Sequence, residues 1–216
     1  MQRKRRYKNS KVIAVTGGIG SGQSTVCSIL KEFGCKIIDV DRKAKQIIAK
    51  DKFLQKELQT AFGNNIFYRD GRLNRHQLAE IAFRDEEKTN QLNKLVHPRM
   101  VAEIVEEMEE ARFSQRYPLI VIDAALVFEI SIEQMFDSII VVYASLKKRT
   151  ERVRKRDKLS EEDIRARVNR QIPLEEKRKW ADFEIDNNGS LEDLKIQTKK
   201  IFDKLVEQIP LERNSR

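Results

Sequence analysis

Cysteine and histidine are both scarce in this chain of 216 residues, which has two of each. Cys27 and Cys35 do not form a C-x-x-C pair, and His76 and His97 lie far apart in the sequence. The pattern therefore indicates neither a disulfide framework nor a zinc site. Unpaired thiols of this kind are typical of the reducing cytosol, so we expect a cytoplasmic protein in which both cysteines are small apolar residues.

Long apolar runs are also missing. The two longest, at residues 119–122 and 139–144, have the length of strands rather than the roughly 20 residues of a transmembrane helix. The basic start of the chain, residues 1–11, lacks the apolar segment of a secretory signal and predicts a solvated tail. We therefore expect no membrane partner, and the oligomeric state is left open.

The net charge of +9 favours anionic partners. Nucleotides, nucleic acids and membrane surfaces all satisfy that charge. However, the sequence shows no recognisable RNA- or DNA-binding module and no aromatic stacking motif. We therefore expect no specific nucleic-acid partner.

Glycine and proline are few, with eight and four residues, so each one is informative as a boundary. Short β-branched and apolar runs predict five buried strands, at residues 12–16, 36–39, 119–123, 138–143 and 183–186. Helical periodicity in the intervening segments is typical of an α/β fold with a parallel sheet. The length suits a single domain over residues 12–216, with a helical insertion at about 43–112.

Polar pairs spaced three residues apart predict where several helices begin. In this spacing a cap side chain can bond to the first-turn backbone. The pairs are Asn74 with Gln77, Ser160 with Asp163, and Ser190 with Asp193. Pro98 is expected in the first turn of another helix, where its missing N–H costs little.

The strongest motif is the glycine-rich segment GGIGSGQST after the first predicted strand. It matches the phosphate-binding pattern G-x-x-x-x-G-K-[ST] at Gly17, Gly22 and Ser24. Glycines let backbone amides turn inward around phosphate oxygens, and the following helix adds positive potential. Ser24 is placed to offer its hydroxyl to Mg²⁺. The predicted nucleotide-binding residues are Gly17, Gly18, Ile19, Gly20, Ser21, Gly22, Gln23, Ser24 and Thr25.

Gln23 stands where this pattern has lysine. The lysine reaches the β- and γ-phosphates and offsets charge during transfer, whereas glutamine is shorter and neutral. Three explanations stay open. The lysine was removed by engineering, another cation such as Lys148, Arg149 or a nearby arginine compensates for it, or the chain binds nucleotide without catalysis.

Further motifs accompany the loop in a fixed order: IIDVDR, FGNNIFYRDGRLNRHQLAEIAF, LVHP, DAALVFE, a basic R-x-x-x-R-D segment and IDNNG. With VTGGIGSGQSTV they lie within residues 12–205, and the set resembles the dephospho-CoA kinase family. The resemblance implies a three-layer P-loop kinase fold with a five-stranded parallel sheet. It implies ATP-dependent phosphorylation of the ribose 3′-hydroxyl of dephospho-coenzyme A, the last step of coenzyme A biosynthesis, with Mg²⁺.

The resemblance also implies an acceptor-binding role for the insertion at about 43–112. Asp41 of the D-V-D segment corresponds to the base that takes the acceptor's proton and binds this substrate, and Asp39 supports the turn. Asp123 corresponds to a carboxylate acting on Mg²⁺, and His97 to a substrate-binding residue. From the residues alone, ordinary strand-end carboxylates are an equally open alternative for the two aspartates, whereas a lone histidine is more often structural than chemical.

A lid is implied at about residues 147–180. Within it Arg152 and Arg156 match the family's basic positions and are implied as catalytic groups that balance transition-state charge. Asn187 of the I-D-N motif is implied at the ATP adenine. A solvated basic helix face and a plain turn are the alternatives from the residues alone. Another small-molecule or nucleoside kinase is a rival that shares the loop.

Overall fold

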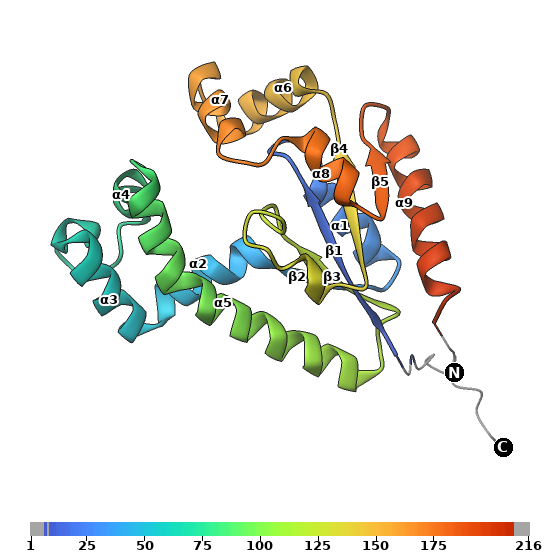
Figure 1. The fold of residues 1–216 in the computed structure, drawn as a ribbon, viewed down its shortest axis with the longest axis horizontal. Helices are drawn as coiled ribbons and strands as arrows, with labels where there is room; N and C mark the ends of the chain where they lie inside the picture. The colour runs from blue at the N-terminus through green and yellow to red at the C-terminus, as the bar shows by residue number, and fades with distance from the viewer. Residues whose placement is uncertain (1–6, 8, 210–216) are drawn as a thin grey trace. The chain divides into compact units, whose positions relative to one another are not determined.

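A computed structural model describes residue 7 and residues 9–209, so residues 1–6 and 8 of the predicted tail lie outside the described part. The strands are β1 (Lys11–Gly17), β2 (Lys36–Asp39), β3 (Leu119–Asp123), β4 (Ser138–Tyr143) and β5 (Phe183–Asp186). They pair in parallel in the order β2-β3-β1-β4-β5 (Figure 1). The predicted α/β class and five-stranded parallel sheet are confirmed.

The helices connect these strands and follow the last one. They are α1 (Gln23–Glu32), α2 (Val40–Lys50), α3 (Lys52–Phe62), α4 (Arg75–Ala82), α5 (Glu86–Ser114), α6 (Leu146–Asp157), α7 (Glu161–Asn169), α8 (Leu174–Trp180) and α9 (Leu191–Val206), with 3-10 turns η1 (Asn64–Ile66) and η2 (Glu133–Met135). Across residues 7 and 9–209, no helix has both the length and the apolar character needed to cross a membrane.

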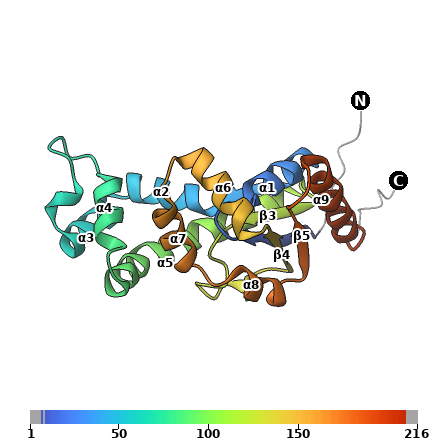
Figure 2. The ribbon, with the colours of Figure 1, turned by 90° about the horizontal axis from the view of Figure 1, so that it is seen from above.

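Both faces of the sheet are buried, which explains why its strands are nearly continuous apolar runs. Alternate residues of β1 point to opposite faces, and Val12, Ile13, Ala14 and Val15 are all fully buried. Ile13 and Val15 belong to a core shared with α1 and α9. Figure 2 shows α1 and α9 on one side of the sheet and α8 on the other, where α8 contacts β4. The predicted three-layer arrangement is confirmed.

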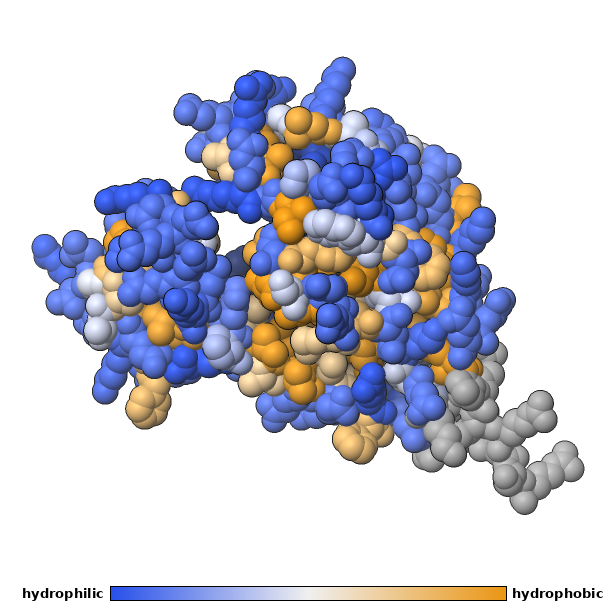
Figure 3. Space-filling model, viewed as in Figure 1, coloured by the Kyte–Doolittle hydropathy of each residue, from blue (hydrophilic) through white to orange (hydrophobic). Residues whose placement is uncertain are grey.

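Two compact units make up the chain. Residues 40–107 form one, and the segments before and after them form the other, which holds the sheet. In the smaller unit Leu54, Leu58 and Phe62 line the buried face of α3, as their helical spacing predicts. The acceptor-binding role predicted for residues 43–112 stays a prediction. On the sheet-bearing unit, the face seen in Figure 3 gathers apolar side chains within a hydrophilic border.

The predicted helix starts are confirmed by their cap bonds. The Asn74 side chain accepts from the Gln77 amide at 3.1 Å, and the Ser160 hydroxyl accepts from the Asp163 amide at 3.0 Å. Ser190 and Asp193 form a reciprocal capping box at the start of α9. Each cap satisfies backbone donors that a helix start otherwise leaves unpaired.

The expectation for Pro98 was wrong, because this residue lies inside α5 rather than in a first turn. A proline there removes one backbone bond and crowds the preceding turn, at a cost of roughly 3 kcal/mol. Burial offsets that cost, because Val96 and Met100 keep the apolar face of the helix packed on either side of the proline. The Arg99 guanidinium also donates to the carbonyl of Leu95, in the turn before the proline, at 2.9 Å. Packing of the apolar face therefore keeps the helix continuous across the proline.

Candidate active site

The glycine-rich segment connects β1 to α1 at the carboxyl end of the central strand. β1 pairs with β3 on one side and β4 on the other, so the strand order reverses there. Ligands of parallel α/β sheets commonly bind at such a point. Gly20 and Gly22 have φ of 78° and 97°, in the left-handed region that favours glycine. The fold thus places the predicted phosphate-binding loop at the point where ligands of such sheets commonly bind.

Several backbone amides of this loop are available to an anion. The amide of Ser21 bonds to the Gly18 carbonyl at 2.9 Å, and that of Ile19 to Gln171 Oε1 at 2.9 Å. The amides of Gly20, Gly22, Gln23 and Ser24 have no acceptor among the residues described. Gly22 caps α1 without a side-chain bond, so the positive end of the helix faces the loop unscreened. Such amides suit phosphate oxygens.

Gln23 begins α1, and its side-chain nitrogen Nε2 donates a short hydrogen bond to Oδ1 of Asp123 at the end of β3. The next residue, Ser24, is exposed in the first turn of the helix. A hydroxyl and a carboxylate are the oxygen ligands that Mg²⁺ takes beside a bound phosphate. No cluster of three or more metal-ligating side chains occurs within the described residues, and a magnesium ion held partly by substrate does not need one. Ser24 and Asp123 therefore fit the ion.

Arg152 and Asn187 both bond to the backbone of the loop. The Arg152 guanidinium donates to the Asn187 carbonyl at 2.8 Å and lies 3.4 Å from the carbonyls of Gly20 and Ser21. The buried Asn187 side-chain amide donates to the Ser21 carbonyl at 2.7 Å. The structure thus brings both predicted residues to the loop. Contact of Asn187 with adenine stays a prediction.

Arg156 lies apart from these residues. Its exposed guanidinium pairs with Asp157 at 2.7 and 2.8 Å, and this partner raises the pKa of Arg156. A pair so exposed contributes little to stability, so the arginine can exchange it for another anion. Its predicted role in transfer stays a prediction.

Asp41 and His97 belong to the smaller unit. Asp41 is exposed in the first turn of α2, directly after β2. His97 is half-buried in α5, and burial lowers its pKa below the usual value, so the ring is neutral near pH 7. Neutral imidazole can donate and accept a hydrogen bond. Both residues keep their predicted roles as proposals.

Sequence reasoning assigned no role to a buried ion pair behind the loop after β3. The ammonium of Lys177 in α8 is fully buried, 2.6 Å from Glu129 Oε1 and 2.8 Å from the Ala125 carbonyl. Glu129 also accepts from the Ile172 amide at 3.0 Å. Burial lowers the pKa of Lys177 despite the carboxylate. Lys177 lies in the charged run EEKRK, so its pattern indicated an exposed helix face.

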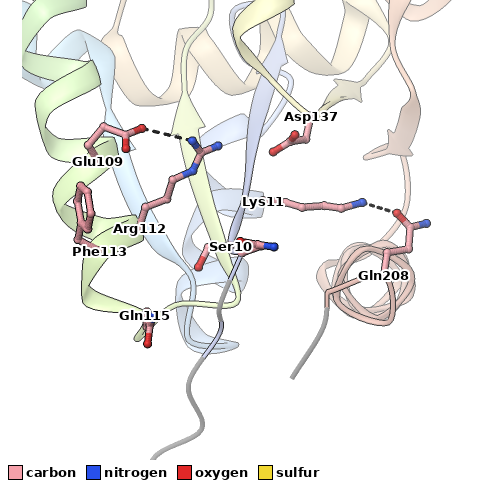
Figure 4. A pocket seen from close by; sticks show the side chains of 9 residues that line it. Ser10, Lys11, Glu109, Arg112, Phe113, Gln115, Asp137 and Gln208 are labelled. Atoms are coloured by element: carbon pink, nitrogen blue, oxygen red, sulfur yellow. Dashed lines mark hydrogen bonds and ion pairs between the residues drawn. The ribbon is translucent and has the colours of Figure 1, made fainter. Parts of the chain in front are cut away.

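A pocket lies at the other end of the strands. Lys11 begins β1 there, and Asp137 directly precedes β4. Its lining residues are Asn9, Ser10, Lys11, Glu109, Arg112, Phe113, Gln115, Asp137 and Gln208. Figure 4 shows Lys11 bonded to Gln208, and Arg112 bonded to Glu109, within this lining. Because the loop follows the carboxyl end of β1, the pocket is separate from the predicted phosphate site.

Both cysteines are buried, and we expect them to resist alkylation in the folded protein. Burial, reinforced by the nearby Asp123 carboxylate, raises the pKa of Cys27 well above its usual value, and burial raises that of Cys35 to about 12. Since the thiolate is the reactive form, iodoacetamide should label both roughly 100-fold more slowly than in urea. Mass spectrometry of timed reactions measures the two rates. Equal labelling of Cys27 with and without urea would contradict this expectation.

Comparison with known proteins identifies the family. Residues 11–193 match the sequence model of the family described as dephospho-CoA kinase. A dephospho-CoA kinase of Listeria monocytogenes is 37% identical over 196 residues, covering 91% of this chain and 98% of the relative. One from Arabidopsis thaliana is 38% identical over 192 residues, covering 89% and 82%.

Solved structures agree with these sequences. The TT1252 protein of Thermus thermophilus superposes with a TM-score of 0.79 at 34% identity, covering 91% of this chain and 98% of its own. A dephospho-CoA kinase from Campylobacter jejuni superposes with a TM-score of 0.61 at 28% identity, covering 91% and 97%. The motif order, the fold and these relatives agree, and the chain belongs to the dephospho-CoA kinase family.

Proposed function

We propose that this chain transfers the γ-phosphoryl group of ATP to the ribose 3′-hydroxyl of dephospho-coenzyme A, giving coenzyme A and ADP. The observation that carries the proposal is the loop after β1, with unpaired amides at Gly20, Gly22, Gln23 and Ser24, in a member of this family. The transfer is in line and needs no covalent enzyme intermediate. Binding and charge stabilisation therefore supply most of the catalysis.

The chain's residues divide this task. Loop amides hold the phosphates, and Arg152, already at the loop carbonyls, balances charge with Arg156. Asp41 orients the acceptor hydroxyl and accepts its proton. His97 contributes to acceptor binding, and Asn187 keeps the loop in shape beside the adenine. Mg²⁺, held through Ser24 and Asp123, would neutralise charge on the phosphates.

The direct test measures coenzyme A by chromatography and ADP by a coupled assay, with ATP, Mg²⁺ and dephospho-coenzyme A. We expect equal amounts of the two products. An acceptor without the 3′-hydroxyl serves as the matched control and should give neither. A stronger preference for a nucleoside acceptor would overturn the substrate assignment.

A nucleotide-binding protein without catalysis is the second candidate, because Gln23 is neutral and bonded to Asp123. The same assay on Gln23→Lys separates the two. Our proposal requires turnover by the unaltered chain. Turnover by the lysine variant alone would favour the second candidate for this chain, and ATP binding without turnover in both would refute the kinase assignment.

A further inference from the structure

Gln23 leaves the loop without the positive charge that lysine brings, and three cations of α6 bond to the loop or to the turn after β5. Lys148 donates to the Asn188 carbonyl, and Arg152 donates to the Asn187 carbonyl and lies 3.4 Å from the carbonyls of Gly20 and Ser21. Arg149 is the third, and its terminal nitrogens differ from those of Arg152.

Arg149 is a buried cation with unused donors. Only 7% of its surface is exposed. Its Nε donates to the Ile19 carbonyl at 2.9 Å, whereas its two terminal nitrogens have no hydrogen bond, and the guanidinium no ion pair, among the residues described. Burial lowers its pKa, only partly offset by Tyr143 and Glu175. A charge kept out of water without a counter-ion is costly, and a bound anion would remove that cost.

Two glycines of the loop pack closely against Arg149. A Cβ added to Gly18 would meet the terminal nitrogen of Arg149, and one added to Gly20 would lie 2.6 Å from its carbonyl oxygen. Both glycines therefore allow α6 to approach the phosphate loop closely. The terminal nitrogens of Arg149 thereby lie against the backbone whose amides are expected to bind phosphate.

We infer that the Arg149 guanidinium provides positive charge beside the nucleotide phosphates, in place of the lysine that usually follows the last glycine of such a loop. The inference rests on the proposed function, and it identifies the cation that compensates for the neutral Gln23. The ligand is the polyphosphate of a nucleoside triphosphate. Guanidinium suits the task because it is held by a fixed Nε bond and presents its other donors together.

A four-variant cycle tests this assignment: the unaltered chain, Arg149→Gln, Gln23→Lys and the double variant. Calorimetry gives the Kd for ATP without acceptor, and the coupled assay gives turnover. We expect Arg149→Gln to weaken ATP binding and lower turnover by roughly 10- to 100-fold, the range for one charged hydrogen-bond partner. Gln23→Lys should restore most of that loss in the double variant, and change the unaltered chain less than threefold.

Arg154→Gln is the matched control, because it removes the same charge from an exposed position of α6. It should leave both readouts unchanged. Adenosine is the matched ligand, since its affinity should not depend on Arg149. Circular dichroism and urea unfolding check the fold of each variant, and Arg149→Lys, which keeps the charge, should lose less than Arg149→Gln.

Equal ATP affinity in Arg149→Gln and the unaltered chain would overturn the inference. The inference would also be overturned if Gln23→Lys changed ATP affinity by the same factor with and without Arg149. Two cations that serve the same phosphates should not have additive effects. Should Arg149→Gln not fold, Arg149→Met removes the charge while keeping an apolar stem, and ATP affinity equal to that of the unaltered chain would likewise overturn the inference. ATP binding that depends on Arg149, without coenzyme A formation, would refute the proposed function and support the inference.

Discussion

Alanine in place of Gly22 is expected to weaken ATP binding by roughly 100-fold or more, the size of effect seen when one preorganised donor is lost. Gly22 has φ of 97°, where a side chain costs roughly 1–2 kcal/mol. A Cβ there would also collide with the side-chain amide of Asn187, which is bonded to Ser21. The loop must then move, and its amides lose their common direction. Calorimetry with ATP measures the change.

Gly34→Ala provides the control for strain alone. Gly34 follows α1 with φ of 89°, yet nothing lies within 4 Å of an added Cβ. This variant should lose roughly 1–2 kcal/mol of unfolding free energy in urea and keep its ATP affinity. Equal losses of affinity in the two variants would show that the approach of Asn187 to the loop has no role in binding.

Asparagine in place of Asp41 is expected to lower kcat by roughly 10²–10⁴-fold, the usual contribution of a general base. The amide keeps the size of the side chain but cannot accept the proton of the acceptor hydroxyl. ATP affinity should change little, because the proposed role concerns the acceptor. Steady-state kinetics with both substrates, and calorimetry with ATP alone, separate the two effects.

Asp70→Asn is the matched control for Asp41→Asn. Asp70 lies in the same unit, and its carboxylate bonds to the backbone and side chain of Arg72. Its neutralisation should leave kcat unchanged. If Asp41→Asn retained the kcat of the unaltered chain, Asp41 would have no part in proton transfer.

Local chemistry made much of this fold predictable. Strands such as residues 119–123 are apolar because both sheet faces are covered, and caps such as Ser190 act within a few residues of the chain. The glycine loop is equally local. Its position at the central strand follows from the parallel topology, which the alternation of strands and helices indicated.

Pairings between distant segments were not predictable in this way. Lys177 lies in a charged run that looks exposed, and its burial depends on Glu129 in a different part of the chain. The sequence shows that Arg149 is basic, but its burial follows from the packing of α6 on Gly18 and Gly20. Pro98 was misplaced because tertiary packing outweighs the local preference of proline.

The burial of Lys177 also limits how the segment proposed as a lid can move. Arg149 and Val153 anchor its beginning in the sheet-bearing unit, while Lys177 fastens its end through Glu129 and Ala125. Just before that end, the Gln171 side chain accepts from the Ile19 amide and the Ile172 amide donates to Glu129, so about residues 154–170 are the stretch that these contacts leave unfastened. We expect such a segment to move as a flap between two fixed ends, and its amides should exchange with deuterium sooner than those at these ends.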